Sequence, residues 1–316
     1  MSDPAATLAG RPVLVTGASG FLGTRLCQRL TAAGVEVHGV SRQDRQSGES
    51  AVRWWRADFG DEGRIAALLA SVRPAVVFHL AGVVTGRRDR ELVLPVLREN
   101  LLATIHLMSV ASESGYRVVL AGSMEEPTAE GGGATPCSPY AAAKWAASGY
   151  ARMFSSLYDL DVRILRIFMV YGPGRQDPRR LIPYVTQSLL RGETPQLSSG
   201  RRRTDWVYVD DVVEALIRAG VAKHLTGTTI DIGSGVSTTV REIAERLAIL
   251  IGGDVAPGFD CLPDRPLETE ERADTATAER LLGWKPRVAL AEGLAMTVDW
   301  FRQLAPDLVS AKDRFS

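Results

Sequence analysis

A glycine-rich turn near the start of the chain limits the possible folds more than any other feature of the sequence. An apolar run at 12–15 precedes the sequence Thr16-Gly17-Ala18-Ser19-Gly20-Phe21-Leu22-Gly23, and an amphipathic segment over 21–33 follows it. Strand, glycine turn and helix in this order are typical of dinucleotide-binding folds. The glycines let the backbone approach a pyrophosphate, and the helix N-terminus offers free N–H groups to that anion. The alternative is a tight turn without a ligand. We expect cofactor contacts from Gly17, Ser19, Gly20, Phe21 and Leu22.

Strand and helix patterns alternate after this turn, which predicts a parallel sheet with helices on both faces. The continuous apolar run at 74–82, for example, suits a strand that is buried on both sides. The alternation breaks after residue 171. We therefore expect an α/β fold with a Rossmann-type doubly wound parallel sheet at 1–170, to which segments near 205–235 return. A smaller C-terminal α/β substrate-binding domain is expected at 171–316.

Charge and cysteine content exclude several classes of protein. The formal net charge is +0, so no broad basic surface is available to neutralise the phosphates of a nucleic acid. The three cysteines, Cys27, Cys137 and Cys261, are far apart, which favours a reducing compartment over a disulfide framework or a metal cluster. No signal peptide is evident at 1–10, and no apolar run approaches the ~20 residues that span a bilayer. We expect a cytoplasmic protein with no metal and no nucleic-acid or membrane partner.

The end of the second predicted strand indicates which dinucleotide is bound. Folds of this type that bind NAD usually carry an acid there for the ribose hydroxyls, whereas this chain has Ser41 and Arg42. A hydroxyl and a guanidinium suit a 2′-phosphate, through charge-assisted hydrogen bonds. The sequence therefore predicts that NADP(H) is preferred, with NAD(H) possible. The alternative for Arg42 is a solvated loop residue.

The third predicted strand, 52–59, ends in Asp58-Phe59, which can bracket an adenine. In this interpretation Asp58 accepts a hydrogen bond from the adenine amino group and Phe59 packs on the ring. Asp58 could also cap the predicted helix at 61–71.

Small and apolar residues follow the strand at 74–82, where backbone can approach a cofactor: Leu80, Ala81 and Gly82. His79, within the strand, is expected to be a hydrogen-bonded structural residue rather than a catalyst. Asn100 falls in a predicted helix over 91–114. It is expected either to orient backbone or cofactor groups, or to be solvated.

A serine at a strand end and a Tyr/Lys pair on the next helix form the candidate catalytic group. Tyr140 and Lys144 are four residues apart and share one helix face. A nearby ammonium favours the phenolate form of a tyrosine, because opposite charges attract. Ser123 ends the fifth predicted strand and could hold the reacting oxygen. Together these residues predict a proton-transfer site that faces the cofactor.

These features, in this order, resemble the extended short-chain dehydrogenases/reductases that act on nucleotide sugars, the NAD(P)-dependent nucleotide-sugar epimerase/dehydratase family. The resemblance covers nearly the whole chain. Besides the glycine turn, Ser123 and the Tyr140/Lys144 pair, it rests on three later motifs: Val170-Tyr171-Gly172-Pro173-Gly174, Asp205-Trp206-Val207-Tyr208-Val209-Asp210-Asp211-Val212, and Leu282-Gly283-Trp284-x-Pro286.

The resemblance implies a role for each candidate residue. Tyr140 would exchange a proton with the sugar C4 oxygen, Lys144 would tune it and hold the nicotinamide ribose, and Ser123 would bind the same oxygen. Arg265 matches the diphosphate-binding arginine of the family. Many relatives carry a second diphosphate-binding arginine at the position of Thr204, and we expect Arg203 to take that role here.

Other positions depart from the family pattern. Met169 stands where relatives have an asparagine that reaches the substrate phosphate, and methionine cannot donate that hydrogen bond. Glu125 resembles the residue that removes the C5 proton in 4,6-dehydratases. Met124 cannot act as the acid at C6 that one dehydratase subgroup uses. The run Gly122-Ser123-x-Glu125-Glu126 also resembles 4-keto-6-deoxy-sugar reductases.

The principal functional prediction is therefore an NADP(H)-dependent nucleotide-sugar 4-keto-reductase. The alternatives are a C4 epimerase or 4,6-dehydratase that retains its cofactor and, more remotely, a non-catalytic NADP(H) sensor. The expected ligand is a nucleoside-diphosphate sugar whose base and sugar are left open. The resemblance also implies a homodimer through the helices at 91–114 and 140–158.

Overall fold

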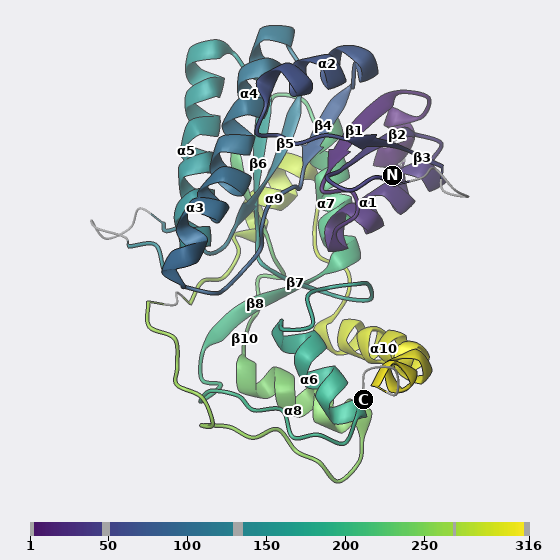
Figure 1. Ribbon diagram of the computed structural model, residues 1–316, viewed down its shortest axis with the longest axis vertical. Helices are drawn as coiled ribbons and strands as arrows, with labels where there is room; N and C mark the ends of the chain where they lie inside the picture. Colours follow the sequence, from purple (N-terminus) through teal and green to yellow (C-terminus); the bar gives the residue numbers. More distant parts are fainter. Residues whose placement is uncertain (1–2, 46–50, 129–134, 268–269, 313–316) are drawn as a thin grey trace. The chain divides into compact units, whose positions relative to one another are not determined.

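The computed structural model describes residues 3–45, 51–128, 135–267 and 270–312, and within this part of the chain two compact units form (Figure 1). Three chain segments make up each unit, because the chain passes between them more than once. Unit 1 contains Met1–Phe168, Val212–Ile232 and Asp274–Lys285, and unit 2 contains Met169–Asp211, Gly233–Ala273 and Pro286–Ser316.

Unit 1 is built on a parallel sheet of seven strands among the described residues, in the order β3-β2-β1-β4-β5-β6-β9 (Figure 1). Every pair of neighbours is parallel, as the sequence predicts for a doubly wound sheet. The strands are β1 (Pro12–Thr16), β2 (Glu36–Ser41), β3 (Val52–Arg56), β4 (Val76–His79), β5 (Val118–Ser123), β6 (Val162–Ile167) and β9 (Thr229–Ile232).

Helices cover both faces of this sheet, and the alternation of side chains along β4 shows how. Val77 belongs to the core under α2, α4 and α5, whereas Val76 and Phe78 point to the opposite face and lie against Gly220 of α7. Because both faces are buried, the strand is apolar up to His79, its last residue. The helices of this unit include α1 (Phe21–Ala32), α2 (Glu62–Val72), α4 (Ala103–Ser114), α5 (Pro139–Tyr158), α9 (Thr275–Leu282), most of α7 (Val209–Val221) and a short 3-10 helix, η1 (Pro4–Leu8).

The helix predicted over 91–114 is not regular. It consists of η2 (Arg90–Leu92), α3 (Val93–Val96), a π-helical segment η3 (Leu97–Leu102) and α4. By length and composition alone, Arg90–Ser114 could cross a membrane, although a single such helix in the described residues is weak evidence. Leu107 and Met108 are fully buried in the core between α2 and α5, which is the environment of a core helix in a folded domain.

Polar side chains at helix N-termini explain where α2 and α5 begin. Ser138 accepts a hydrogen bond from the N–H of Ala141, and Pro139 fills the first position of α5, where its missing N–H costs nothing. Asp61, not Asp58, caps α2 by accepting from the N–H of Arg64. The suggestion that Asp58 caps this helix is therefore wrong.

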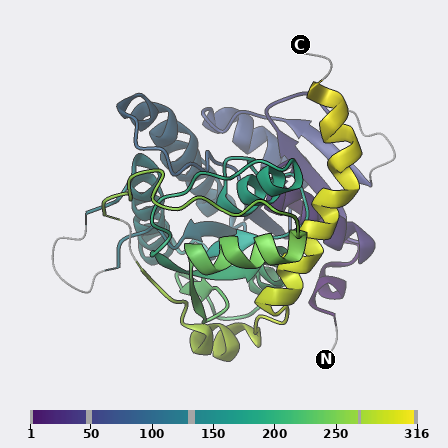
Figure 2. The same cartoon turned by 90° about the horizontal axis from the view of Figure 1, so that it is seen from below.

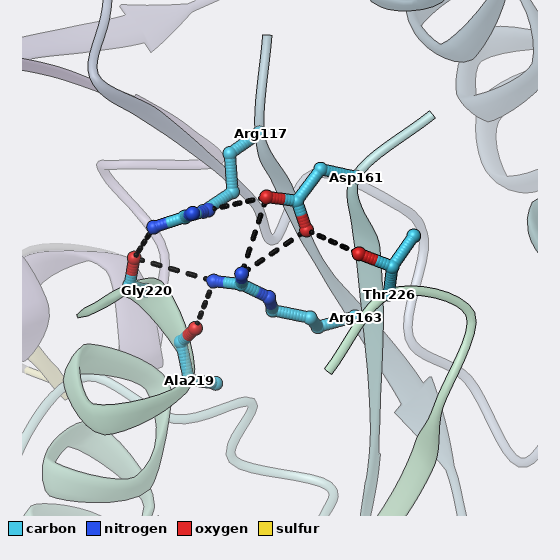
Figure 3. A network of polar contacts seen from close by, with 6 residues as sticks. All are labelled: Arg117, Asp161, Arg163, Ala219, Gly220 and Thr226. Carbon is cyan, nitrogen blue, oxygen red and sulfur yellow. Dashed lines mark hydrogen bonds and ion pairs between the residues drawn. The ribbon is translucent and has the colours of Figure 1, made fainter. Parts of the chain in front are cut away.

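A buried polar network holds the C-terminal end of α7 against the beginnings of β5 and β6 (Figure 3). Arg163, which is 1% exposed, donates to the carbonyl oxygen of Ala219 at 2.6 Å, and Arg117 donates to that of Gly220 at 3.0 Å. Asp161 pairs with both guanidiniums, at 2.7 Å to Arg117 and 3.1 Å to Arg163. The two cations thus satisfy carbonyl groups that have no partner within the helix.

Unit 2 contains a sheet of three strands among the described residues, in the order β10-β8-β7, with α6, α8 and α10 packed on one another (Figure 1; Figure 2). Buried Asp205 of β8 ties three segments together, because it accepts hydrogen bonds from the N–H groups of Ser234, Gly235 and Ala273. The elements are β7 (Met169–Tyr171), α6 (Leu181–Leu190), β8 (Arg203–Tyr208), β10 (Ser237–Thr239), α8 (Val240–Ile251) and α10 (Leu290–Lys312).

Candidate active site

The glycine turn between β1 and α1 is shaped by close backbone contacts. Gly17 has a φ of +66°, and a Cβ there would lie 2.9 Å from backbone atoms of Leu80 and Ala81. A Cβ on Gly23 would overlap the carbonyl oxygen of Gly17. No described side chain caps α1, whose N-cap is Gly20 and whose first turn has no acid. This open helix end fits the pyrophosphate of a dinucleotide. Around it lie Ser19, which is exposed, and Phe21 and Leu22, which are half-buried.

A buried chain of hydrogen bonds joins β1 to the segment after β4. Thr104 donates to the carbonyl oxygen of Asn100 at 2.6 Å, so its own oxygen accepts from Nε2 of His79 at 3.1 Å. Nδ1 of His79 therefore accepts from the hydroxyl of Thr16 at 2.8 Å, and that hydroxyl oxygen accepts from the N–H of Ala81 at 3.1 Å. The direction of every bond in this series follows from the first, because the carbonyl oxygen of Asn100 can only accept. The series of hydrogen bonds fixes the position of Ala81.

His79 is a structural residue, as predicted. It is 1% exposed, and burial together with the charge of Lys144 lowers the pKa of the ring to about 3. The ring is therefore neutral near pH 7, in agreement with its place in the hydrogen-bond chain.

Asn100 lies in the π-helical segment and orients backbone. Its side-chain oxygen accepts from the N–H of Val83 at 2.7 Å, and its side-chain nitrogen donates to the carbonyl of Val83 at 2.8 Å. Gly82 lies beside the same amide, and a Cβ on it would come within 3.1 Å of the Asn100 oxygen. Asn100 thus holds in place the segment of Leu80, Ala81 and Gly82 that we expect to approach a cofactor.

The end of β2 carries an ion pair that the sequence does not predict. Arg42 donates to Glu99 of η3 at 2.8 Å, and the two side chains are 68% and 38% exposed. The hydroxyl of Ser41 accepts from the N–H of Gln43. Arg42 is thus a largely solvated residue that follows β2, as the alternative predicts, and it is paired with a carboxylate.

Asp58 and Phe59 follow β3, which ends at Arg56 instead of continuing to residue 59. Asp58 is exposed, and its side chain accepts from the N–H of Gly60 at 3.0 Å. Phe59 is 7% exposed, belongs to the core, and lies 5.9 Å from the ring of His79. The carboxylate of Asp58 thus faces solvent, whereas the ring of Phe59 is part of the protein interior.

The predicted catalytic residues lie at the end of β5 and in the first turns of α5. Lys144 is 7% exposed, and its ammonium donates to the carbonyl oxygen of Ala121 at 2.7 Å, which binds α5 to β5. Ser123 ends β5, and its hydroxyl accepts from the N–H of Glu125 at 3.2 Å. Tyr140 is 7% exposed and packs with Val96 in a small apolar cluster.

Glu125 also lies at this end of the sheet. Its carboxylate accepts from the hydroxyl of Ser138, the N-cap of α5, at 3.4 Å and lies 3.9 Å from the sulfur of Cys137. Met124, the residue before it, is 3% exposed. Glu125 thus has a half-buried carboxylate two residues after Ser123, whereas the intervening Met124 is a core residue.

Glu126 is a functional candidate that the sequence prediction missed. It is 5% exposed, and its carboxylate accepts from the N–H of Ser123 at 2.7 Å. The sequence shows only that a second acid follows Glu125. The burial of Glu126 results from a turn that no local sequence pattern predicts. Glu126 places a second carboxylate against the end of β5.

The predicted diphosphate-binding arginines belong to unit 2. Arg203 donates to the carbonyl oxygen of Ser237 in β10 at 2.8 Å, and its own N–H donates to Glu270. Arg265 is exposed and follows Asp264, which is anchored by Ser199. Met169 pairs with Trp206 across β7 and β8.

The arrangement in unit 1 is suited to proton transfer beside a dinucleotide. A buried ammonium, a phenol and a hydroxyl lie on neighbouring ends of one strand and one helix, on the same chain unit as the open N-terminus of α1. Within the described residues no group of three or more His, Cys, Asp or Glu is placed to hold a metal ion. The described residues thus offer acid–base side chains and, at the N-terminus of α1, backbone N–H groups for an anion.

Comparisons with known proteins agree with this arrangement. Residues 13–233 match the sequence profile of the family described as "NAD dependent epimerase/dehydratase family". A UDP-glucose 4-epimerase of Mycolicibacterium smegmatis is 36% identical, over 92% of this chain and 98% of its own length. A dTDP-glucose 4,6-dehydratase of Streptomyces antibioticus is 31% identical, over 92% of both chains.

A solved structure shows what a similar chain binds. MoeE5 in complex with UDP-glucose and NAD is 32% identical and superimposes with a TM-score of 0.83, over 93% of this chain and 99% of its own. Together, these comparisons favour the epimerase or dehydratase alternative of the sequence prediction over its principal form, a 4-keto-reductase.

Proposed function

The chain belongs to the NAD dependent epimerase/dehydratase family, and on this premise we propose that it is a nucleotide-sugar 4-epimerase that retains its dinucleotide. The UDP-glucose 4-epimerase of Mycolicibacterium smegmatis is similar in sequence over 92% of this chain. A UDP-hexose is therefore the first substrate to test. The observation that carries the choice of epimerase over dehydratase is Met124. In one subgroup of dehydratases the residue after the serine protonates the leaving oxygen at C6, and here that residue is a buried thioether that has no proton to give.

The proposed chemistry uses three residues of unit 1. The phenolate of Tyr140 accepts the proton of the C4 hydroxyl and later returns it. The ammonium of Lys144 stabilises that phenolate, and the hydroxyl of Ser123 donates to the same sugar oxygen. When bound, the dinucleotide supplies reversible two-electron oxidation of the sugar at C4. Inversion requires that the 4-keto sugar presents its other face before it is reduced.

For the cofactor we propose NAD. MoeE5 binds NAD, and the guanidinium of Arg42, on which the expectation of NADP(H) rests, is paired with Glu99. The open end of α1 and the backbone of Leu80, Ala81 and Gly82 would hold the pyrophosphate and the nicotinamide half. The carboxylate of Asp58 faces solvent and would accept from the adenine amino group.

The substrate diphosphate is assigned to unit 2. Arg265 and Arg203 are its proposed cationic partners, and Arg203 is already oriented by Ser237. Neutralisation of a diphosphate by two guanidiniums gives charge-assisted, bidentate hydrogen bonds.

A 4,6-dehydratase is the second candidate, because one observation favours it. Glu125 is a half-buried carboxylate two residues after Ser123, in contact with the N-cap of α5. A base at that place could remove the C5 proton of a 4-keto sugar. Glu125→Gln separates the two functions, since it would abolish dehydration and leave epimerisation within a few-fold of the wild-type rate.

One experiment tests the proposal against a reductase. The purified protein is denatured, the released nicotinamide dinucleotide is quantified, and UDP-glucose is then incubated with fresh protein without added cofactor. Stoichiometric NAD and formation of UDP-galactose support the epimerase. Protein that is free of dinucleotide and turns over only with added NADPH would overturn it.

We also assign to the protein a homodimer through α3, η3, α4 and α5. These elements pack together in unit 1, and α3, η3 and α5 expose large apolar side chains to solvent. A surface of this kind is costly in water and typical of an interface. The exposed residues are Val93 (44%), Leu94 (60%), Leu102 (38%), Trp145 (43%), Tyr150 (42%), Leu157 (66%) and Tyr158 (54%).

A further inference from the structure

We propose that Glu126 is a positioning residue of this site, whose buried carboxylate fixes the backbone of Ser123 and keeps the side chain of Lys144 charged. The proposal deepens the proposed function, because it concerns the same proton-transfer site. It assigns a purpose to a carboxylate that touches neither the sugar nor the cofactor in the proposed chemistry.

The turn after β5 brings this carboxylate back onto the strand end. The N–H of Glu126 donates to the carbonyl oxygen of Ser123 at 3.1 Å, which closes the turn. The side chain then folds back, and its Oε1 accepts from the N–H of Ser123 at 2.7 Å. Both bonds hold the residue whose hydroxyl is proposed to bind the sugar oxygen.

Gly122 makes room for this arrangement. A Cβ at Gly122 would lie 2.7 Å from Oε1 of Glu126, closer than a carbon and a carboxylate oxygen can approach. The carboxylate therefore lies directly against the backbone of β5. Any larger residue at 122 would push the carboxylate away from Ser123.

Lys144 and Glu126 bind the backbone of β5 two residues apart, because the ammonium donates to the carbonyl oxygen of Ala121 at 2.7 Å and the carboxylate accepts from the N–H of Ser123 at 2.7 Å. Lys144 is 7% exposed, and burial lowers the pKa of its ammonium, whereas the negative charge of Glu126 raises it. Burial raises the pKa of Glu126, whereas the charges of Lys144 and Arg166 lower it. Each ion is thus stabilised by the other in a region from which water is excluded.

The other groups around this pair do not replace Glu126. His79 of β4 is neutral near pH 7, because the pKa of its ring is lowered to about 3. Arg166 of β6 is engaged in a bidentate pair with Asp231, at 2.7 and 2.9 Å. Tyr140, on the same helix as Lys144, is the partner on which the ammonium acts. Among the described groups, Glu126 is the carboxylate whose charge is felt at Lys144.

The sequence makes a direct test practical, because it contains four lysines: Lys144, Lys223, Lys285 and Lys312. Protein labelled with 13Cε-lysine is titrated by NMR as wild type and as Glu126→Gln, which keeps the acceptor for Ser123 but removes the charge. Lys144→Arg assigns the signal. Glu113→Gln, at an exposed position of α4, is the matched control for loss of one carboxylate.

In the Glu126→Gln variant, the midpoint of Lys144 is expected to fall by about one pH unit, because an opposing charge has been removed nearby. The other lysines and the Glu113→Gln variant should titrate as in the wild type. Glu126→Asp keeps the charge but not the reach to Ser123, and should leave the midpoint near its wild-type position. An unchanged midpoint in Glu126→Gln would overturn the proposal.

If Glu126→Gln does not fold, the wild type decides the question. A 13C-labelled carboxylate at Glu126 that is ionised at pH 7 beside a protonated Lys144 supports the proposal, and a protonated carboxyl overturns it. These titrations need neither substrate nor cofactor, so their result is independent of whether the protein proves to be a 4-epimerase.

Discussion

At the scale of single residues, His79 shows how burial fixes a protonation state that the sequence leaves open. The hydrogen-bond chain from Thr104 to Thr16 requires one ring nitrogen to donate and the other to accept. A doubly protonated ring would present two donors and would break the bond to the hydroxyl of Thr16. The neutral ring is therefore part of the structure that positions Ala81 beside the glycine turn.

This histidine makes stability depend on pH in a predictable direction. The folded-state pKa, about 3, lies below the ordinary histidine pKa of 6.5, so the unfolded chain takes up the proton first as the pH falls. The contribution is fully present above pH 6.5 and is lost toward pH 3, at up to about 1.4 kcal/mol per pH unit. Urea unfolding of wild type and His79→Gln between pH 7 and 4 measures it. Parallel curves for the two proteins would contradict the prediction.

Arg42 and Glu99 give a second prediction at this scale, on the choice of dinucleotide. The pair is exposed and worth at most about 1 kcal/mol, so Glu99→Gln should free the guanidinium at little cost to stability. The freed Arg42 can then bind a 2′-phosphate, and the affinity for NADP relative to NAD should rise about fivefold. Isothermal titration of cofactor-free protein measures both affinities. Arg42→Ala added to Glu99→Gln should cancel the gain, and an unchanged ratio in Glu99→Gln alone would refute it.

At the scale of elements, the C-terminal end of α7 depends on two arginines that are remote in sequence. Burial lowers the pKa of Arg163 to about 10, and the neighbouring carboxylate of Asp161 opposes this shift. The guanidinium remains charged at neutral pH and satisfies carbonyl groups of the last helical turn (Figure 3). Its loss would leave the carbonyl oxygen of Ala219 without this donor, whereas Arg117 would still bind Asp161 and the carbonyl oxygen of Gly220.

Arg163→Met should therefore lower the free energy of unfolding by about 2–3 kcal/mol, because a buried carbonyl oxygen loses its charged donor and Asp161 loses one of its two cations. Arg179→Met is the matched control. Arg179 also pairs with an aspartate, Asp177, but is 71% exposed, and its loss should cost about 1 kcal/mol or less. Equal midpoints of urea unfolding for the two variants would show that the network of Figure 3 does not stabilise α7.

The elements also show what the sequence can and cannot predict. Apolar periodicity and the glycine turn are local signals, and the parallel sheet that they predict is confirmed. The end of β3 was misplaced because the side chain of Asp58 binds the N–H of Gly60 and forms a turn where the residue pattern still suits a strand. The π-helical segment η3 escaped prediction because its apolar residues follow ordinary helical spacing.

Within the candidate site, too, local contacts can be predicted from the sequence, whereas contacts between distant residues cannot. Tyr140 and Lys144 could be paired from sequence because a helix brings residues four apart together. The contacts of Arg42 with Glu99 and of Glu126 with Ser123 depend on how side chains turn in space, which no spacing encodes. The catalytic and binding roles assigned to the individual residues remain predictions.

At the scale of the whole molecule, the apolar surface of α5 and its neighbours predicts the state of association. Leu157 is 66% exposed, and an arginine there would place a charge within the proposed interface. Wild-type protein at micromolar concentration should have the light-scattering mass of two chains, and Leu157→Arg the mass of one. Ile249→Arg, at an 81% exposed position of α8 in unit 2, should remain a dimer. A monomeric wild type would refute the assignment.

The strands of unit 1 come from distant parts of the chain, which limits where the protein can be cut into fragments. β9 comes from residues 229–232, more than sixty positions after β6, and covers the outer edge of that strand. A recombinant fragment that stopped near residue 170 would present the unpaired N–H and C=O groups of β6 to solvent, as a template for another chain. Such a truncation should therefore precipitate or assemble edge to edge, and limited proteolysis that cuts between residues 171 and 211 should leave the two pieces bound together.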